Sequence, residues 1–172
     1  KKLMVSHFNT RKRFDKLIQK EIDLAKLGKA AKITAKMNSL EDQDIIKLLY
    51  KASQNGVEVR LIVRGFCCLI PGLDGISQNI KVTSILDRFL EHGRIYHFHN
   101  DGDEKTFIGS ADWMTRNLDR RIEVLTTIKD KAFQQELKDI LHIQTSDNVK
   151  ARHIDADRQN LYVEKKKNKP EI

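Results

Sequence analysis

The sequence has 172 residues, enough for one sizeable hydrophobic core or two small domains. Charged residues make up 33% and hydrophobic residues 40%, as in water-exposed globular domains, and no apolar run approaches the roughly 20 residues of a membrane helix. Lys and Arg number 32 against 24 Asp and Glu, and the resulting charge of +8 favours anionic partners over cationic ones, although a solvated basic surface also explains it.

The first half of the sequence alternates helical and strand patterns. Residues 11–28 have apolar side chains at helical spacing, and Gly28 is placed to end the helix. Residues 30–38 predict a short strand, and residues 40–56 predict a second helix with acidic residues in its first turn. Residues 57–65, VEVRLIVRG, become wholly apolar toward their end, as in an interior strand. A strand–helix–strand unit of this kind predicts parallel neighbours.

A Gly-rich loop over residues 66–79 separates the two halves and carries both cysteines. Cys67 and Cys68 are adjacent, which disfavours a relaxed disulfide, and their apolar neighbours Phe66 and Leu69 indicate buried thiols. A reducing compartment fits this usage.

The second half predicts more strands and one long helix. Its elements are a strand that passes into a short helix (80–93), strands at 94–100, 105–110 and 121–128, a helix at 130–146, and a polar tail with a candidate strand at 160–166. NDGDE forms a turn between the first two of the three strands. One α/β domain over residues 1–172, with a mixed β-sheet flanked by helices and a core at about 8–155, is the simplest account.

Three histidines between residues 92 and 99 raise the question of a metal site. On a strand, His97 and His99 share one face, and Asp101 and Asp103 follow in the turn. Four such groups can hold a metal, but acidic hairpin turns are common and NDGDE lacks the spacing of a calcium loop. We therefore favour partly exposed strand histidines beside a solvated turn.

His92 stands apart from the other two histidines. It precedes Gly93 at the predicted helix–strand junction, Arg94 follows two residues later, and IGSADW ends the next strand. This arrangement resembles the phospholipase D-like phosphotransfer fold, in which an imidazole acts on phosphorus. The match is loose, because the expected Lys, Asp and Asn are Arg94, His99 and Asp112. A hydrolytic phosphodiesterase is therefore disfavoured, while the fold is expected to be shared.

Long segments of the sequence resemble the C-terminal catalytic domain of bacterial polyphosphate kinase. They include RFDKLIQKEI, AKMNSLEDQDIIKLLYKAS, GVEVRLIVRGFCCLIPGL, SILDRFLEHGRIYHF, IGSADWMTRNLDRRIEV and DNVKAR. They cover most of residues 8–155 in the order found in that family, whose enzymes are several times longer. The sequence also begins without Met, so we expect a piece of a longer protein.

The resemblance implies a function and a set of ligands. The family transfers the terminal phosphate of ATP reversibly to inorganic polyphosphate, with Mg²⁺, through a phosphohistidine in a preceding domain that has no counterpart here. The implied partners are ATP or ADP, polyphosphate and the rest of the kinase chain in a homo-oligomer, without specific nucleic acid. A cytoplasmic location is implied, with membrane association of the complete enzyme as an option, and no metal site is expected within these residues.

The resemblance also assigns two site residues. The Arg of VRG and the His of LEH contact nucleotide phosphates in the family, and they match Arg64 and His92, which makes His92 the catalytic candidate here. Independently, Arg64 ends an apolar strand, where ligands gather in α/β sheets, and a guanidinium grips two phosphate oxygens at once. Without the resemblance, a structural Arg and a surface His remain the ordinary alternatives. Weaker candidates for the same pocket are Lys36, Asn38, Arg94, Ser110, Arg116 and Asn117, and Arg116, Arg120 and Arg121 form either a solvated face or a polyphosphate track.

Three functions compete at this point. A kinase domain would bind nucleotide and polyphosphate without making polymer alone. A phospholipase D-like phosphodiesterase would pair two copies of His92 in a dimer. A basic module without chemistry would bind any polyanion in a salt-dependent way. The resemblance favours the first.

Overall fold

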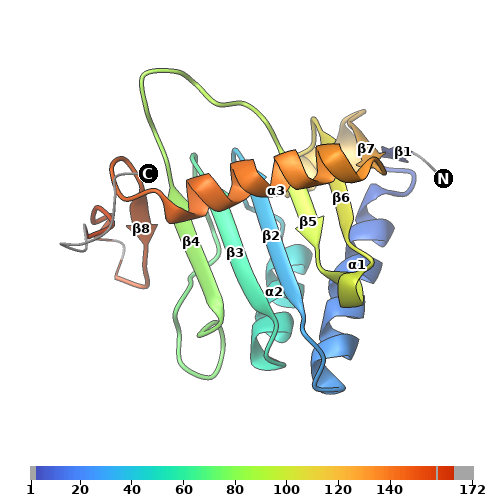
Figure 1. The fold of residues 1–172 in the computed structure, drawn as a ribbon, viewed down its shortest axis with the longest axis horizontal. Helices are drawn as coiled ribbons and strands as arrows, with labels where there is room; N and C mark the ends of the chain where they lie inside the picture. The colour runs from blue at the N-terminus through green and yellow to red at the C-terminus, as the bar shows by residue number, and fades with distance from the viewer. Residues whose placement is uncertain (1–2, 158, 165–172) are drawn as a thin grey trace.

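A mixed sheet organises the molecule, for which a computed structural model describes residues 3–157 and 159–164 (Figure 1). In chain order the strands of the described residues are β1 (Leu3–Val5), β2 (Lys32–Met37), β3 (Glu58–Val63), β4 (Ile80–Ser84), β5 (Ile95–Phe98), β6 (Lys105–Gly109), β7 (Val124–Ile128) and β8 (Arg152–Ile154). Across the sheet the order is β1-β7-β6-β5-β2-β3-β4-β8. Strands β2, β3 and β4 are parallel, and every other pairing is antiparallel. The predicted mixed sheet and its parallel strand–helix–strand unit are confirmed.

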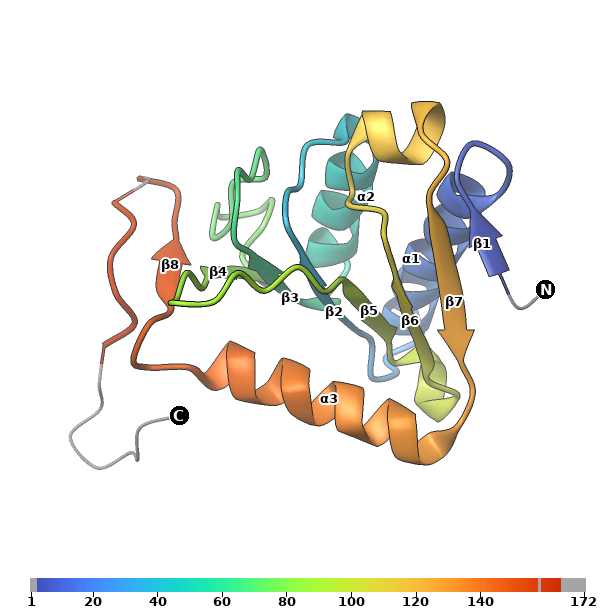
Figure 2. The same cartoon turned by 90° about the horizontal axis from the view of Figure 1, so that it is seen from above.

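Helices cover both faces of the sheet. Helices α1 (Thr10–Lys26) and α2 (Gln43–Gln54) lie on one face, and α3 (Lys131–Ser146) crosses the other (Figures 1 and 2). None of the helices in the described part of the chain has the length and apolar content needed to span a bilayer. The sheet is therefore enclosed on one face by a helix pair and on the other by a single helix.

The main hydrophobic core lies between the sheet and the helix pair. Phe14 of α1 packs 4.8 Å from the Tyr96 ring and edge-on to Trp113 at 5.5 Å. All three side chains are fully buried. Offset and edge-on aromatic pairs of this kind add to the stability given by burial alone. Helix α2 begins at the carboxylate of Asp42, which accepts a hydrogen bond from Ile45 N at 3.0 Å and so satisfies a free N–H of the first turn.

One end of the sheet collects the residues that follow β2, β3 and β6 and those that precede β5. Because β5 is antiparallel to β2, its start lies beside the end of β2, with Ile95 opposite Lys36. The end of β6 reaches the same place, with Ile108 opposite Ile95. We call this end of the sheet the carboxyl rim and define it by Asn38, Arg64, His92 and Asp112.

The short helix expected within residues 80–93 is absent. Strand β4 ends at Ser84, and residues 85–94 form an irregular loop that extends beyond the sheet (Figure 1). Leu86, Phe89 and Leu90 of this loop are 62%, 80% and 69% exposed. A short helix is stable only when it packs against the rest of the fold, and these three apolar side chains remain exposed. His92 is therefore carried by a loop rather than by a helix end.

Several smaller expectations need correction. Strand β7 begins at Val124 rather than at residue 121, because a single π-helical turn, η2 (Arg116–Arg120), precedes it. Strands β1 and β8 were not predicted, and β1 places part of the sheet ahead of residue 8. The candidate strand at 160–166 amounts to one bridge between Arg152 and Tyr162 in its described part, and residues 165–166 lie outside the described residues.

The two cysteines differ from the expectation of buried thiols. Cys68 is exposed and Cys67 is partly exposed, and both are free. Phe66, which was expected to shield them, is itself 55% exposed. Burial nevertheless raises the pKa of the Cys67 thiol to about 11, so this thiol is protonated at neutral pH.

Candidate functional site

The carboxyl rim brings Arg64 and His92, the two site residues expected from the sequence, into contact. Arg64 follows β3 and donates from Nε to Asn38 Oδ1, at the end of β2, over 2.5 Å. Its Nη2 lies 3.0 Å from His92 Nδ1, on the 85–94 loop. Three segments far apart in the sequence thus meet around one guanidinium.

The contact between Arg64 and His92 fixes the tautomer of the imidazole. A guanidinium has only N–H donors, so Nδ1 of His92 must be the acceptor. The neutral ring then carries its proton on Nε2. His92 is exposed, and this N–H is a donor that a bound anion can use.

A buried carboxylate holds the frame of the site. Asp112 Oδ1 accepts from Asn38 N at 2.8 Å and from Asn38 Nδ2 at 3.2 Å. The same carboxylate accepts from Arg94 Nε at 3.1 Å and from Arg94 Nη2 at 3.3 Å. Asp112 is 5% exposed, so Arg94 compensates a charge that would otherwise be buried unpaired. Asn38 therefore reaches Arg64 from a fixed position.

The pairing of Arg94 with Asp112 explains two departures from the phospholipase D-like pattern. That pattern has Lys and Asn where this chain has Arg94 and Asp112. Here the added negative charge at Asp112 is matched by Arg94, and Arg94 Nη1 also donates to the carbonyl oxygen of His92 at 2.8 Å. The pair is thus used to hold the backbone at His92.

The cations of the rim differ in how far they are neutralised. Arg94 pairs with Asp112, and the amine of Lys36 pairs with Glu91. Arg64 contacts Asn38 and His92, which are neutral acceptors, and no carboxylate of the described residues lies within ion-pair distance of it. Arg64 is half-buried, so its positive charge faces an environment less screened than bulk water. This arrangement attracts an anion to Arg64.

The backbone at Gly65 lies unusually close to the end of β2. Gly65 N donates to Asn38 O at 2.7 Å. A Cβ atom at position 65 would lie 2.7 Å from Asn38 O and 2.8 Å from Ser39 Oγ. The glycine after Arg64 therefore permits the close packing of the ends of β2 and β3 at the rim.

The weaker candidates are placed in different ways. Ser110 is exposed and its hydroxyl accepts from Val124 N at 3.2 Å, while Asn117 is buried and donates to Glu123 at 2.7 Å. Asn117 is thus a structural residue. The structure leaves exposed the three arginines that had been considered for a polyphosphate track, Arg116, Arg120 and Arg121.

The histidines and aspartates considered for a metal site have other partners. His97, predicted to be partly exposed, is 7% exposed, and its Nδ1 lies 2.9 Å from the hydroxyl of Thr106. Asp101 pairs with Lys29 and Asp103 with Lys105. No group of three or more His, Cys, Asp or Glu side chains that could hold a metal occurs among residues 3–157 and 159–164. Strand β5 ends at Phe98, and His99 follows it directly; both His97 and His99 line the cavity under α3, as expected for two residues on one face.

Two residues of the rim were missed as functional candidates. Asp112 was noted only as a departure from a pattern, and Glu91 was not considered. Their pairings with Arg94 and Lys36 join residues 18 and 55 positions apart. Such pairings depend on how distant segments meet in the fold, and no local spacing in the sequence reveals them.

Comparison with known proteins gives consistent matches. Residues 3–172 match the family described as "Polyphosphate kinase C-terminal domain 2". A polyphosphate kinase of Vibrio vulnificus is 52% identical over 163 residues, which are 95% of this chain and 23% of that protein. The chain therefore spans about a quarter of the length of such relatives.

Solved structures give the same result for the fold. A polyphosphate kinase from Porphyromonas gingivalis matches with a TM-score of 0.96 and 45% identity, over 100% of this chain and 26% of that chain. A phospholipase D family member, Nuc from Salmonella typhimurium, has a TM-score of 0.62 at 15% identity, over 89% of this chain and 97% of that chain, which shows a shared fold only. By sequence and by structure, the chain belongs to the polyphosphate kinase C-terminal domain 2 family.

Proposed function

We propose that this chain is the part of a polyphosphate kinase that binds the phosphates of ATP during reversible transfer of the terminal phosphate to inorganic polyphosphate. The observation that supports this most directly is the contact between Arg64 and His92 at the carboxyl rim. It combines a cation without a carboxylate partner among the described residues and an imidazole with a free N–H. Both groups suit a phosphate anion.

Phosphoryl transfer depends mainly on positioning and on stabilising charge. The guanidinium of Arg64 can hold two oxygens of one phosphate, and its contact with Asn38 Oδ1 fixes its orientation. His92 Nε2–H can donate to the phosphate whose bond breaks, where added negative charge is stabilised best by donors already in place. In this proposal the phosphohistidine nucleophile belongs to a preceding domain.

Magnesium is expected with ATP in this family, but the rim does not fit a metal site of its own. Asp112 is occupied by Asn38 and Arg94, and Glu91 by Lys36. We assign no magnesium ligand to these residues. The remaining partners that we propose are ADP, polyphosphate and the rest of the kinase chain, in a homo-oligomer located in the cytoplasm or at the membrane.

The test is to change Arg64 in the complete kinase chain. Arg64→Ala should lower the rate of polyphosphate synthesis by about a hundredfold or more, because the loss of one donor aimed at the developing charge costs roughly 3–4 kcal/mol. Arg64→Lys keeps the charge but not the two-pronged geometry and should be intermediate. The measurements are kcat and KM for ATP, with the melting temperature as a check on folding.

A matched control is Lys47→Ala, an exposed charge on α2. It should leave turnover unchanged. Near-normal turnover of Arg64→Ala, or its unfolding, would place Arg64 in a structural role. Cleavage of a simple phosphodiester by the chain alone, lost in His92→Ala, would instead favour the phosphodiesterase function.

A further inference from the structure

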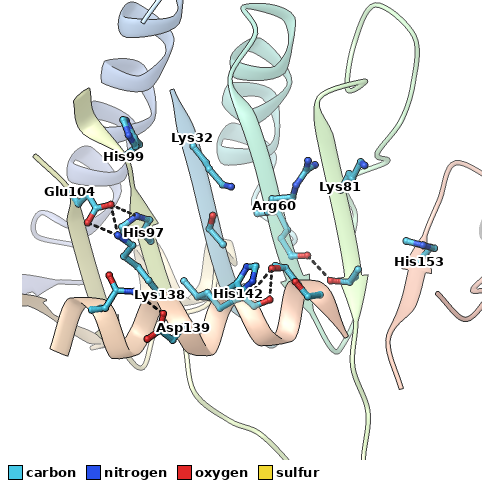
Figure 3. A pocket seen from close by; sticks show the side chains of 17 residues that line it. Lys32, Arg60, Lys81, His97, His99, Glu104, Lys138, Asp139, His142 and His153 are labelled. Atoms are coloured by element: carbon cyan, nitrogen blue, oxygen red, sulfur yellow. Dashed lines mark hydrogen bonds and ion pairs between the residues drawn. The ribbon is translucent and has the colours of Figure 1, made fainter. Parts of the chain in front are cut away.

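A second cationic region lies on the opposite face of the sheet from α1 and α2. Here a cavity of about 650 Å³ opens between α3 and the strands (Figure 3). Its charged lining includes Lys32, Arg60, Lys81, Lys138, Glu104 and Asp139. Figure 3 shows the first three projecting from three neighbouring strands, beside the helix that carries Lys138. None of these residues belongs to the carboxyl rim.

The sheet face under α3 changes character from one row of residues to the next. Toward the carboxyl rim, Ile62 and Ile95 pack with Leu141 of α3 in a small apolar cluster. The next row away from the rim is polar. It runs across four neighbouring strands in register through His97, Thr34, Arg60 and Lys81. Helix α3 therefore covers the apolar row and leaves the polar row beside an open cavity.

The positive charges of this cavity outnumber its carboxylates. Four Lys or Arg side chains line it against two acidic ones. Glu58 is shared by Lys32 at 3.2 Å and Arg60 at 3.0 Å, and Lys138 pairs with Glu104 at 2.8 Å. In the described part of the chain, no carboxylate lies within ion-pair distance of Lys81.

Arg60 and Lys81 are direct cross-strand neighbours. Like charges placed opposite each other destabilise a sheet, and a bound anion would offset that repulsion. Neighbouring strands lie roughly 4.8 Å apart and Lys32 lies two residues along β2 from the position opposite Arg60, so the cations of β2, β3 and β4 form a staggered line rather than a single point. A line of this kind suits an extended polyanion better than an isolated phosphate.

We propose that this cavity binds a segment of linear inorganic polyphosphate, away from the transfer site at the carboxyl rim. The inference rests on the proposed function, which supplies the polymer. Nucleic acid is disfavoured because no Phe, Tyr or Trp lines the cavity, and binding of single strands relies on stacking of bases on such rings. A chain of phosphates has no bases and needs only the cations. The cavity holds a part of the polymer other than the reacting end.

The test compares two double variants of the 172-residue chain that remove the same net charge. Arg60→Gln with Lys81→Gln alters the cavity. Lys12→Gln with Lys47→Gln alters exposed positions on α1 and α2, on the other face. Long-chain polyphosphate is titrated by calorimetry over a range of salt concentrations, and single-stranded DNA of equal charge serves as the competing polyanion. Circular dichroism verifies that each variant is folded.

The double variant in the cavity, Arg60→Gln with Lys81→Gln, should weaken polyphosphate binding on the order of tenfold for each lost contact. The slope of log K against log salt should fall by about 1.4, at roughly 0.7 for each contact. The control pair should change neither quantity appreciably. If the cavity pair fails to fold, Lys81→Gln alone, at an exposed position, should show about half the change in slope.

If the double variant in the cavity and the control double variant lost equal polyphosphate affinity, the proposal would be overturned, because equal losses would indicate a diffuse basic surface. Equally tight binding of DNA at this cavity would overturn the commitment to polyphosphate. Since the titration needs no turnover, its failure leaves phosphoryl transfer at Arg64 standing. Conversely, normal turnover of Arg64→Ala would refute the rim assignment while leaving the titration result valid.

Discussion

At the level of single residues, the neutral partners of Arg64 matter more than its charge. Arg94 and Lys36 lie at the same rim, but each is paired with a carboxylate. Arg64 is held instead by an amide oxygen and an imidazole nitrogen. These contacts fix its direction without cancelling its charge. In the function proposed above, that combination prepares Arg64 for an anionic ligand.

We expect His92→Gln to retain a good part of the transferase rate and His92→Ala to retain little. The reason is that the proton of His92 is on Nε2, and the amide of Gln can place an N–H near that position. The measurement is kcat of the complete kinase chain for both variants. A general acid would behave differently, with both substitutions lowering the rate by roughly 10²–10⁴-fold.

The control for His92 is His7→Gln, at an exposed position outside the rim. His97 is unsuitable as a control, because it is buried and contacts Thr106, so its truncation would affect folding. A loss of rate in His7→Gln as large as that in His92→Ala would refute the assigned role of His92.

At the level of elements, the sequence predicted those segments whose local signals agree with their packing. Both early helices are amphipathic and end at Gly28 and Gly56, which adopt φ values of +70° and +88° that glycine permits. The interior strands were visible as apolar runs. Strands β1 and β8 have three residues each, too few to show an alternating pattern.

Local signals in the sequence also decide which residues of the candidate site could be selected from it. Arg64 was selected because it ends a buried strand and matches the family resemblance, and His92 because of its neighbours and the same resemblance; their roles stay predictions. The helix expected before His92 was wrong, because apolar spacing alone does not form a short helix when its apolar side chains do not pack against the fold. The role of Asp112 depends on the register that places the end of β6 beside the start of β5.

We expect Gly65→Ala to destabilise the junction of β2 and β3 by about 1–3 kcal/mol, the usual cost of overpacking. The added methyl group would lie 2.7 Å from a backbone oxygen of Asn38, which cannot move as easily as a flexible side chain. Because Arg64 precedes this residue, ATP affinity should fall as well. Chemical denaturation and nucleotide titration measure the two effects.

Gly93→Ala is the matched control, because a Cβ at position 93 has no atom within 4 Å. It should cost little stability. If Gly65→Ala were as mild as Gly93→Ala, the two strand ends would not be in the close contact described.

At the level of the whole molecule, one face of the sheet is buried in a conventional hydrophobic core, and the other face is covered only in part. The helix pair α1 and α2 buries the aromatic cluster around Phe14. On the opposite face, α3 covers only part of the strands. On this incompletely covered face His97 is 7% exposed, so it contributes to the response of the fold to acid.

We expect His97 to make the fold sensitive to pH between about 6.5 and 4. Burial lowers the pKa of His97 to about 4, with contributions from Lys138, His99 and Lys32, while Glu104 opposes the shift. Below the unfolded pKa of 6.5 the unfolded chain binds the proton and the folded chain does not, so the free energy of unfolding decreases as pH falls. The loss is complete below the folded pKa and amounts to on the order of 3 kcal/mol.

Denaturation of the wild type and of His97→Gln at several pH values tests this expectation. Gln keeps a polar group near Thr106 but cannot be protonated. The wild type should lose stability relative to the variant on acidification from pH 6.5 to 4, and the difference should be constant above that window. Parallel curves across the window would show that His97 does not carry the acid sensitivity.

The three-residue strands β1 and β8 have a consequence for how separate molecules meet. They form the two outer positions of the sheet, beside β7 and β4, which have five residues each. An unpaired strand is a template on which another chain can add, and short outer strands limit this. If either terminal segment were trimmed away, a longer strand would become the exposed margin, with Val124 and Leu125 on one side and Val82 on the other. Short outer strands such as β1 and β8 thus limit edge-to-edge pairing at the two margins of the sheet.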